Sequence, residues 1–574
     1  MRHLFESRLR RGARLFEPGV HIALRLPYGA LVLSLALAQG CSQGAQPRKY
    51  SPGSVERVLN VRAADLRAAI ATRIGSDDRP PWVTPGRWQR VRATYQRFGN
   101  GPLWLEAGGV QARATALLDA VRAAPEHALD TAAYPLSAIE RVVDAKRLTD
   151  TASAGTVADA DVLLTSAYVA YAATMLAGQV DPKTVSQAWF IPASPQELDS
   201  AIVRGIEAPD MKASLAAMAP QDPDYNALKV AYARYRRIAA SGGWPAVASG
   251  RDPVSRAALH ARLAAEFEAD TGRSQTRGAD SVVANGTPGT GHAISGNPDQ
   301  HLRTLLSQLQ QRYGLEPTGR LGAATLAVLN VSPADRAQRI GANLERHRWL
   351  PRYLGSRYIY VNVPAFRLDA YDSGKKALSM KVVVGDEFEG KTTPVFSDSM
   401  ETVAFRPYWN VTPDIQRKEI APKVARDAAY LARNDMEYYK DGGVTRIRQR
   451  PGEKNSLGLV KFLFPNSHNI YLHDTPAKAL FAQADRAASH GCIRLERPAE
   501  LAQWVLGWPA DKVEAAMHSA KNNQGVRLPQ KLPVYIVYFT VYVRDGELYF
   551  GDDVYGRDEK LEEAVSTTAG GGGA

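Results

Sequence analysis

L-P-V-Y-I-V-Y-F-T-V-Y-V, residues 532–543, is the run that most clearly predicts β-structure in this chain. Every residue after Leu532 and Pro533 is β-branched or aromatic, the composition typical of strands. Asp545-Gly546 follows and predicts the tight turn of a hairpin with the next run, E-L-Y-F. Other runs of strand character lie upstream, at residues 358–364, 380–385 and 469–474. The C-terminal part is therefore expected to be β-rich.

Further upstream, the apolar residues change to helical spacing. Val110–Ala124 and Ala160–Ala177 both show this pattern. A smaller helical unit is expected from about residue 252, with a first helix near 254–268 and two helical runs within 305–330. Between them, the stretch 272–291 is poor in large apolar residues and predicts a disordered insertion.

The length and composition indicate several globular domains. A chain of 574 residues exceeds the usual size of a single hydrophobic core, and a hydrophobic fraction of 45% is ordinary. The formal net charge of +12 is compatible with nucleic acid, an anionic membrane or an anionic polymer such as a cell wall. Because no basic block with interleaved aromatic residues is present, nucleic acid is not expected as a partner.

The N-terminus has the pattern of an export signal. Several arginines precede the apolar run at 29–38, which is too short for a membrane span of about 20 residues. The A-Q-G-C that ends at Cys41 resembles the lipobox of bacterial lipoproteins, although Ala38 and Gln39 depart from its usual residues. We expect a periplasmic protein, anchored to a membrane if Cys41 is lipidated. The alternative is ordinary cleavage nearby.

The body of the chain keeps a single cysteine, Cys492, because the other is Cys41. A lone thiol in an exported chain risks mispairing, so its presence favours chemistry, although a buried small hydrophobe is the alternative. A nucleophilic cysteine needs a base, an orienter for that base and N–H donors for the oxyanion. The N–H groups of Gly491 and Cys492 are candidate donors. His490 would share a face with Cys492 in an extended segment, and His473 is the other candidate base.

I-Y-L-H-D-T-P, residues 470–476, followed by S-H-G-C-I-R-L, residues 489–495, resembles the active-site signature of the L,D-transpeptidases. These are YkuD-type cysteine enzymes of the bacterial cell wall. Stretches at 102–110, 309–330 and 343–351 resemble, in turn, the scaffold domain, the peptidoglycan-binding domain and the linker of the large YcbB-like branch. Stretches at 393–398, 407–413 and 451–466 resemble its substrate-facing loops and cap. Arg406 stands where that branch commonly has asparagine.

The resemblance implies a multidomain α+β chain. We expect a signal peptide with lipobox (1–41), a helical scaffold domain (42–250) and a small peptidoglycan-binding-like helical domain (251–335) with its insertion at 272–298. A β-rich catalytic domain (336–563) would follow, with a cap inserted within about 412–466, and then a flexible tail (564–574). The insertion makes wall binding by the small domain less secure, and a helical packing spacer is the alternative.

The same resemblance assigns roles to residues around the cysteine. Cys492 is the nucleophile and His473 the general base, oriented by the backbone carbonyl of Asp474. The choice of His473 over His490 rests on the family. His490 is expected to shape the site, with Ser489 and Gly491 as auxiliary residues of the oxyanion loop.

Four further residues are expected to bind substrate. Arg494 could hold a substrate carboxylate, although a structural salt bridge is the alternative. Tyr471, Trp409 and Asn410 could line the pocket, or simply pack in the core or at its rim. No metal or other cofactor is expected, because the signature offers no ligand set with zinc-type spacing.

The resemblance implies an L,D-transpeptidase that forms 3–3 peptidoglycan crosslinks through a cysteine thioester and releases D-Ala. Its partners would be peptidoglycan stem peptides, and carbapenems would acylate the cysteine. Two alternatives stay open. The thioester could meet water, a protein lysine or a D-amino acid, or the chain could be a non-catalytic peptidoglycan-binding envelope protein. The sequence leaves the oligomeric state open.

Overall fold

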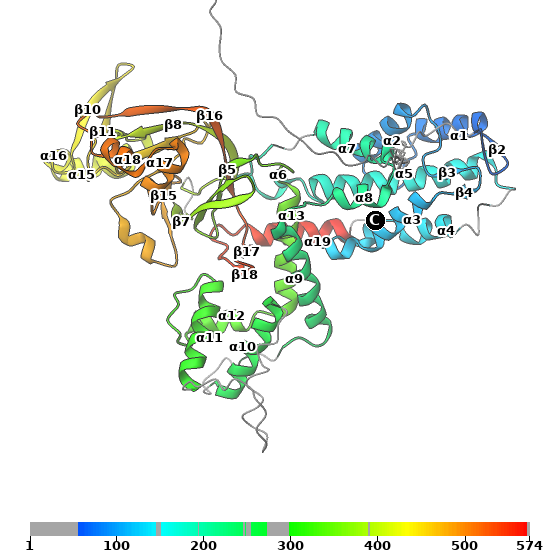
Figure 1. Ribbon diagram of the computed structural model, residues 1–574, viewed down its shortest axis with the longest axis horizontal. Helices are drawn as coiled ribbons and strands as arrows, with labels where there is room; N and C mark the ends of the chain where they lie inside the picture. Colours follow the sequence, from blue (N-terminus) through cyan, green and yellow to red (C-terminus); the bar gives the residue numbers. More distant parts are fainter. Residues whose placement is uncertain are drawn as a thin grey trace, which may run out of the picture. The chain divides into compact units, whose positions relative to one another are not determined.

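The structure is a computed structural model (Figure 1) that describes residues 56–570, apart from 145–147, 149–150, 193–194, 245–246, 248–253, 272–297 and 388–390. All described residues belong to one unit, Lys49–Ala574. The expected signal peptide and Cys41 lie outside the described residues. So does the expected insertion, except for its last residue.

The first part of the described chain is helical. Its helices are α1 (Ala63–Gly75), α2 (Pro85–Arg97), α3 (Ala112–Arg122), α4 (Leu136–Val143), α5 (Ala154–Ala177), α6 (Pro182–Val185), α7 (Pro195–Glu207), α8 (Met211–Ala217) and α9 (Pro223–Ala240). Two small hairpins lie among them, β1 (Arg57–Val58) with β2 (Val61–Arg62), and β3 (Leu105–Glu106) with β4 (Gly109–Val110). α3 and α5 confirm the helices predicted at 110–124 and 160–177.

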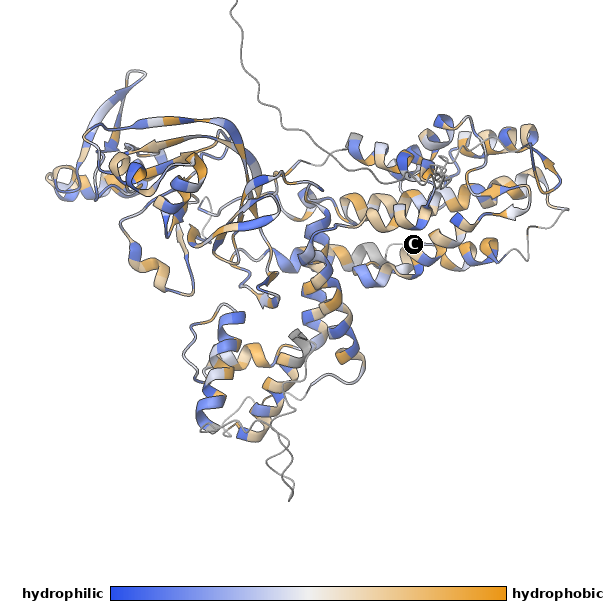
Figure 2. Cartoon of the chain, in the orientation of Figure 1, coloured by the Kyte–Doolittle hydropathy of each residue, from blue (hydrophilic) through white to orange (hydrophobic). Residues whose placement is uncertain are grey.

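α5 is the central helix of this part, and α1, α2, α3, α4 and α7 pack against it. It is long and apolar enough to span a membrane, but 83% of its most apolar window is buried inside the protein, and its colouring in Figure 2 is largely hydrophobic. Near its start, the fully buried Asp161 accepts hydrogen bonds from the Leu103 and Trp104 N–H groups and from the Tyr95 hydroxyl. This carboxylate ties the segment before β3 to the helix, as expected of a core helix in a globular domain.

The smaller helical unit consists of α10 (Arg256–Thr271), α11 (Pro298–Arg312) and α12 (Ala323–Leu329), and α13 (Pro333–Arg348) follows. The first three confirm the helices predicted at 254–268 and within 305–330. Phe267 and Leu309 from this unit belong to the same hydrophobic core as α5. The hydrophobic core is therefore continuous across the boundary expected near residue 250.

α13 includes most of the stretch expected to be a linker at 343–351, and its last residues are buried. Glu345 accepts hydrogen bonds from the N–H groups of Gln179 and Val180, and it pairs with Arg348 at 2.6 Å. Arg348 also donates to the backbone carbonyl of His127 at 2.9 Å. The stretch is thus a buried helix that connects distant parts of the chain, rather than an exposed connection.

The C-terminal part is a nine-stranded sheet in the order β14-β7-β15-β13-β12-β8-β16-β5-β6. The strands are β5 (Arg357–Asn362), β6 (Arg367–Asp372), β7 (Lys375–Gly385), β8 (Phe396–Phe405), β12 (Val460–Leu463), β13 (Leu472–His473), β14 (Ala487–Ser489), β15 (Ile493–Leu495) and β16 (Gln524–Val537). β6 also pairs with β7, so the sheet closes on itself. β5 and β7 confirm two predicted strands, whereas β13 covers only the end of the one predicted at 469–474.

The single strand predicted at 532–543 is wrong in one respect, because the run is divided between β16 and β17 (Val541–Arg544). Between them, the Phe539 N–H donates to the side chain of Asn362, and the Thr540 N–H donates to that of Asn343. Buried amide side chains thus replace the strand partner that a continuous ladder would supply. The hairpin of β17 with β18 (Glu547–Phe550) is confirmed, with both turn residues at positive φ.

The segment between β8 and β12 builds a small structure of its own. Its elements are β9 (Trp409–Asn410), α14 (Pro413–Ile415), a π-helical turn (Gln416–Ile420), α15 (Ala421–Arg426), α16 (Tyr430–Arg433), β10 (Met436–Asp441) and β11 (Val444–Gln449). The strands pair in the order β10-β11-β9. A separate hydrophobic cluster of Val411, Ile420, Met436 and Ile447 lies beneath them. We keep the name cap for residues 409–449.

Four elements complete the part that surrounds the sheet: a 3₁₀ helix (Lys478–Ala482), α17 (Pro498–Leu506), α18 (Ala510–Met517) and α19 (Asp558–Gly570). α19 corrects the prediction of a flexible tail from residue 564. Leu561, Ala564 and Val565 pack against the core of the sheet, and Asp558 pairs with Arg346 of α13. Apolar burial therefore anchors the helix as far as Val565, and residues 571–574 of the expected tail lie outside the described residues.

Candidate active site

Cys492 lies in the bend between β14 and β15. Gly491 takes φ +105°, and a Cβ there would lie 3.1 Å from Ile470 Cδ1, so glycine is required. The Ser489 hydroxyl donates to the Cys492 carbonyl at 2.6 Å and accepts from the Gly491 N–H at 3.2 Å. Because the segment is bent, the extended geometry that would place His490 and Cys492 on one face does not occur.

These contacts separate the two expected oxyanion donors. The Gly491 N–H is engaged by the Ser489 hydroxyl. Among the described residues, the Cys492 N–H has no hydrogen-bond partner. The Cys492 N–H is therefore the donor that remains available to an incoming carbonyl oxygen.

The thiol of Cys492 is half-buried and unpaired. Sγ lies 3.6 Å from the Asn469 carbonyl. Burial raises the pKa of Cys492, whereas hydrogen bonds from Tyr471 and the charges of Lys461 and Arg494 lower it. Burial thus favours the protonated thiol. The thiolate that forms when the proton is lost is stabilised by one hydrogen-bond donor and two cations.

His473 ends β13 and is buried. Its Nδ1 lies 2.5 Å from the Asp474 carbonyl oxygen, so Nδ1 carries the proton and Nε2 is left as an acceptor. Burial, together with the charges of Arg494 and Lys461, lowers the pKa of His473 to about 3. The ring is neutral at neutral pH, which is the state that a general base requires.

The side chain of Asp474 stabilises the loop that orients His473. Its carboxylate accepts the N–H groups of Leu459 and Thr475 and pairs with Lys478 Nζ at 2.7 Å. A Cβ at Gly458, whose φ is +60°, would overlap this carboxylate. The backbone carbonyl of Asp474, which was expected to orient the histidine, is thus fixed by contacts of its own side chain.

His490 contacts the cap rather than the thiol. Its Nε2 lies 2.5 Å from Glu419 Oε1 in the π-helical turn. Lys391 Nζ approaches the same carboxylate at 4.0 Å. The histidine therefore joins the bend at the nucleophile to the cap, a contact that the sequence did not indicate.

The structure brings Tyr471 and Arg494 to the site. The Tyr471 ring meets the His473 ring edge-on at 5.7 Å between centroids, and Tyr471 hydrogen-bonds the thiol. Arg494 is the register partner of His473 across β13 and β15. No salt bridge of Arg494 exists among the described residues, so the alternative of a structural ion pair has no partner there.

Trp409 and Asn410 are not brought to the thiol. Both lie on β9, where they pair with Gln449 and Arg448 of β11. Trp409 packs against the cluster beneath the cap. No hydrogen bond or ring contact joins either residue to Cys492 among the described residues, and their role in substrate binding stays a prediction.

Sequence reasoning missed a group of residues that supports the bend. Thr393, fully buried, donates its hydroxyl proton to the Gly491 carbonyl at 2.8 Å and accepts from the Gly385 N–H at 2.9 Å. The Tyr555 hydroxyl donates to the Gly385 carbonyl and accepts from the Thr393 N–H. No motif connects these positions, because they come from the end of β7, the loop before β8, the bend at Gly491 and the C-terminal segment.

Lys461 was also missed. It stands in the strand run L-V-K-F-L-F between two fully buried apolar residues. Its Nζ lies 3.7 Å from the centroid of the Tyr471 ring. A lysine inside an otherwise apolar strand was the signal that could have identified it.

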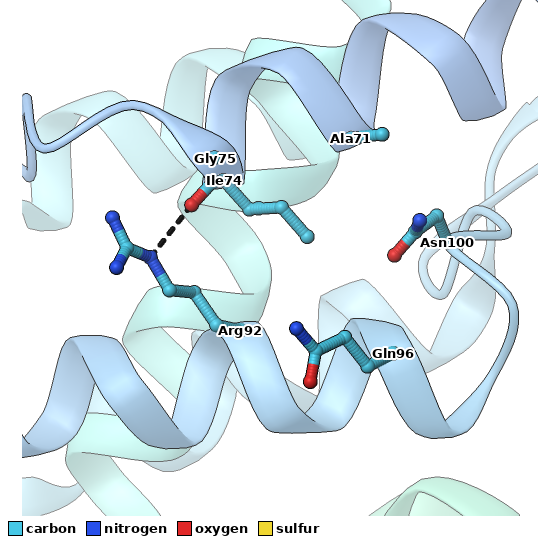
Figure 3. Close-up of a pocket in the computed structure, with 6 residues that line it drawn as sticks. All are labelled: Ala71, Ile74, Gly75, Arg92, Gln96 and Asn100. Carbon is cyan, nitrogen blue, oxygen red and sulfur yellow. Dashed lines mark hydrogen bonds between the residues drawn. The ribbon is translucent and has the colours of Figure 1, made fainter.

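A cavity lies elsewhere in the described residues, between α1 and α2 (Figure 3). It has a volume of about 260 Å³ and is lined by Ala71, Ile74, Gly75, Arg92, Gln96 and Asn100. Arg92 Nε donates to the Ile74 carbonyl beside it at 2.6 Å. Across the described stretches, no three His, Cys, Asp or Glu side chains are placed to hold a metal ion.

Two protein families match separate parts of the chain. Residues 89–231 match the Scaffold domain, and residues 356–536 match the L,D-transpeptidase catalytic domain, YkuD. A Haemophilus influenzae protein named "Putative L,D-transpeptidase" is 29% identical over 247 residues. That alignment covers 40% of this chain and 49% of the relative, so the chain spans about half the length of the curated relative it matches.

Two solved structures have weak overall similarity to the chain. The L,D-transpeptidase of Xylanimonas cellulosilytica is 14% identical with a TM-score of 0.16, over 41% of this chain and 79% of that one. The Ldtfm–avibactam carbamoyl enzyme is 15% identical with a TM-score of 0.15, over 33% and 51%.

The YkuD match contains Cys492, His473, Tyr471, Arg494 and Lys461, whereas Tyr555 lies beyond its end, and the Scaffold match contains α5. The mixed architecture, helical first and β-rich afterwards, agrees with both matches. The chain thus contains an L,D-transpeptidase catalytic domain of the YkuD family at residues 356–536, preceded by a Scaffold domain at 89–231.

Proposed function

We propose that this protein is an L,D-transpeptidase that forms 3–3 crosslinks between peptidoglycan stem peptides. The observation that carries the proposal is the arrangement at the thiol. His473 keeps its proton on Nδ1, against the Asp474 carbonyl, and so presents an acceptor nitrogen. Cys492 has a backbone N–H without a partner among the described residues, a donor in Tyr471 and two nearby cations.

In the first step, the Cys492 thiol loses its proton to His473 and its sulfur attacks the carbonyl of the third stem residue, the L-centre of meso-diaminopimelate. The Cys492 N–H stabilises the oxyanion of the tetrahedral intermediate. The C–N bond to the terminal D-Ala then breaks, and the proton held by His473 passes to the leaving amine. A thioester with Cys492 remains.

In the second step, the side-chain amine of another stem attacks the thioester carbonyl. The C–S bond breaks, a 3–3 amide bond forms, and the proton released by the amine returns to the thiol. The cap contacts the bend through His490 and Glu419, which supports a role in limiting the access of water. Exclusion of water favours aminolysis over hydrolysis.

The remaining regions of the chain fit the bacterial envelope. We place the enzyme in the periplasm, with lipid anchoring through Cys41 as part of the proposal. The helical part before residue 250 is proposed to be the scaffold, and 251–335 to be a peptidoglycan-binding domain. The net charge of +12 suits an anionic wall surface.

The test is mass spectrometry of purified protein incubated with tetrapeptide-bearing muropeptides, with Cys492→Ala in parallel. A dimer that has lost one D-Ala, made by the wild type alone, supports crosslinking through Cys492. Tripeptide monomers alone indicate an L,D-carboxypeptidase, and adducts with added lysine or D-amino acid indicate a different acceptor. No product, together with no carbapenem adduct on Cys492, contradicts the enzyme and favours a wall-binding protein.

A further inference from the structure

Three neighbouring strands place a histidine between two cations. His473 on β13 is the register partner of Arg494 on β15 and of Lys461 on β12. Residues paired in register across strands project from the same face of a sheet. Arg494, His473 and Lys461 therefore form a row across the active site, with the cations about 10 Å apart at their backbones, two strand spacings.

The adjacent row of paired residues shows which face of the sheet is buried in the core. Ile493, Leu472 and Phe462 form the adjacent row, one residue before Arg494 and His473 and one residue after Lys461, and all three are fully buried in the core of the sheet. Alternation then directs the row of Arg494, His473 and Lys461 to the opposite face. Tyr471, which hydrogen-bonds the Cys492 thiol, carries the Lys461 ammonium over its ring.

Neither cation has an anionic partner in the described part of the chain. Lys461 makes a cation–π contact with Tyr471, and Arg494 makes no ion pair. Asp474, beside His473, is engaged with Lys478 and two backbone N–H groups. Glu496, two residues from Arg494, accepts the Lys381 N–H and pairs with Arg497. Burial lowers the pKa of both Lys461 and Arg494, because it disfavours their charged forms. A bound anion would offset this cost.

A donor stem peptide carries carboxylates on both sides of the bond that Cys492 would attack. One belongs to the leaving D-amino acid. The other is the free α-carboxylate of the γ-linked D-glutamate that precedes the attacked residue. They are separated by about three residue lengths, roughly 10 Å in an extended chain. The backbones of Lys461 and Arg494 are also about 10 Å apart, on either side of His473, which matches the separation of the two carboxylates.

We propose that Lys461 and Arg494 bind the two carboxylates that flank the scissile bond, one each, so that the donor is selected by its charge pattern. This deepens the proposed function and rests on it for the identity of the donor. A carboxylate on each cation would also reduce their repulsion of a proton on His473, so donor binding would assist the base. Donors amidated at either carboxyl group would be poor ligands.

The test is binding, which needs no turnover. In a Cys492→Ala background, calorimetry measures Kd for three donor peptides: the tetrapeptide, its D-alanine carboxamide and its D-glutamate α-carboxamide. We expect each amidation to weaken binding about tenfold, the usual size of a charge-assisted hydrogen bond. Lys461→Met should weaken binding of the tetrapeptide equally and abolish the effect of one amidation. Arg494→Met should abolish the effect of the other.

Lys461→Arg, which keeps the charge, should restore most of the binding. Lys375→Met is the matched control, because Lys375 is exposed near the start of β7 and far along that strand from Val383, the partner of Arg494. If Lys461→Met weakens all three peptides by the same factor, the inference is wrong and the lysine is structural. If binding follows the pattern but wild-type protein releases no D-Ala, the proposed function fails and the inference about recognition stands.

Discussion

The hydroxyl of Thr393 donates to the backbone carbonyl of Gly491 at 2.8 Å, one residue before the nucleophile. The same hydroxyl accepts the Gly385 N–H at 2.9 Å. A single buried side chain therefore connects the bend that carries Cys492 to the end of β7. The direction in which the thiol and its N–H point depends on this contact.

Thr393→Val should impair both stability and acylation. It keeps the shape of the side chain but leaves the Gly385 N–H and the Gly491 carbonyl without a partner, at a cost of about 1–3 kcal/mol in the free energy of unfolding. Urea unfolding and the rate of carbapenem adduct formation on Cys492, followed by mass spectrometry, are the measurements. Thr393→Ser retains the hydroxyl and should remain close to wild type. An equal loss in both variants would show that packing, not the hydrogen bond, matters.

Tyr471→Phe should raise the pKa of the Cys492 thiol. Burial already raises this pKa, and it is lowered first by the hydrogen bond of the Tyr471 backbone and next by that of the Tyr471 hydroxyl. Removal of the hydroxyl destabilises the thiolate, so the rate of iodoacetamide alkylation should rise with pH at a higher midpoint than in the wild type. Tyr438→Phe, at an exposed position of β10, should leave the midpoint unchanged. A lower midpoint in Tyr471→Phe would contradict the assigned contact.

His127→Gln should change how the stability depends on pH. Burial lowers the pKa of His127 to about 3, below the ordinary value of about 6.5. The unfolded chain therefore binds a proton that the folded protein excludes, and stability is lost as pH falls below 6.5. The loss from this residue is about 1.4 kcal/mol per pH unit until the pH nears 3.

Urea unfolding of wild type and His127→Gln at pH 7 and pH 5 measures this contribution. The wild type should lose about 2 kcal/mol more than the variant on this acidification. Asp161, whose pKa is raised by burial to about 6, acts in the opposite direction in both proteins and cancels in the comparison. A pH dependence that is the same in both proteins would mean that His127 is protonated in the folded state.

Glu345→Gln should strongly destabilise the protein. The fully buried Glu345 pairs with the equally buried Arg348, and removal of one partner leaves the other charged and uncompensated, at a cost of about 3–5 kcal/mol. Arg122→Gln is the control, since it breaks the exposed pair with Glu140, a type worth about 1 kcal/mol or less. Urea unfolding compares the two. Similar losses would mean that water reaches the Glu345 pair.

Local sequence patterns determined much of this protein. The strands β5 and β7, the hairpin with its Asp545-Gly546 turn and the helices α3, α5 and α10 follow from spacing and turn chemistry, which act between residues close in sequence. The signature around Cys492 was recognisable for the same reason, because its residues are close together in the chain. The bend at Gly491, with its φ of +105° and the Thr393 hydrogen bond to its carbonyl, was not predicted, since that contact joins residues distant in sequence.

Only the tertiary structure decided which distant side chains meet. Arg494, His473 and Lys461 form one row because β15, β13 and β12 are neighbours in a register that no single segment encodes. The division of the 532–543 run arises because buried Asn362 and Asn343 take its N–H groups. The C-terminal segment forms α19 because its apolar residues Leu561, Ala564 and Val565 pack against the core of the sheet. Burial and hydrogen-bond satisfaction depend on the whole chain, whereas propensity depends on the segment.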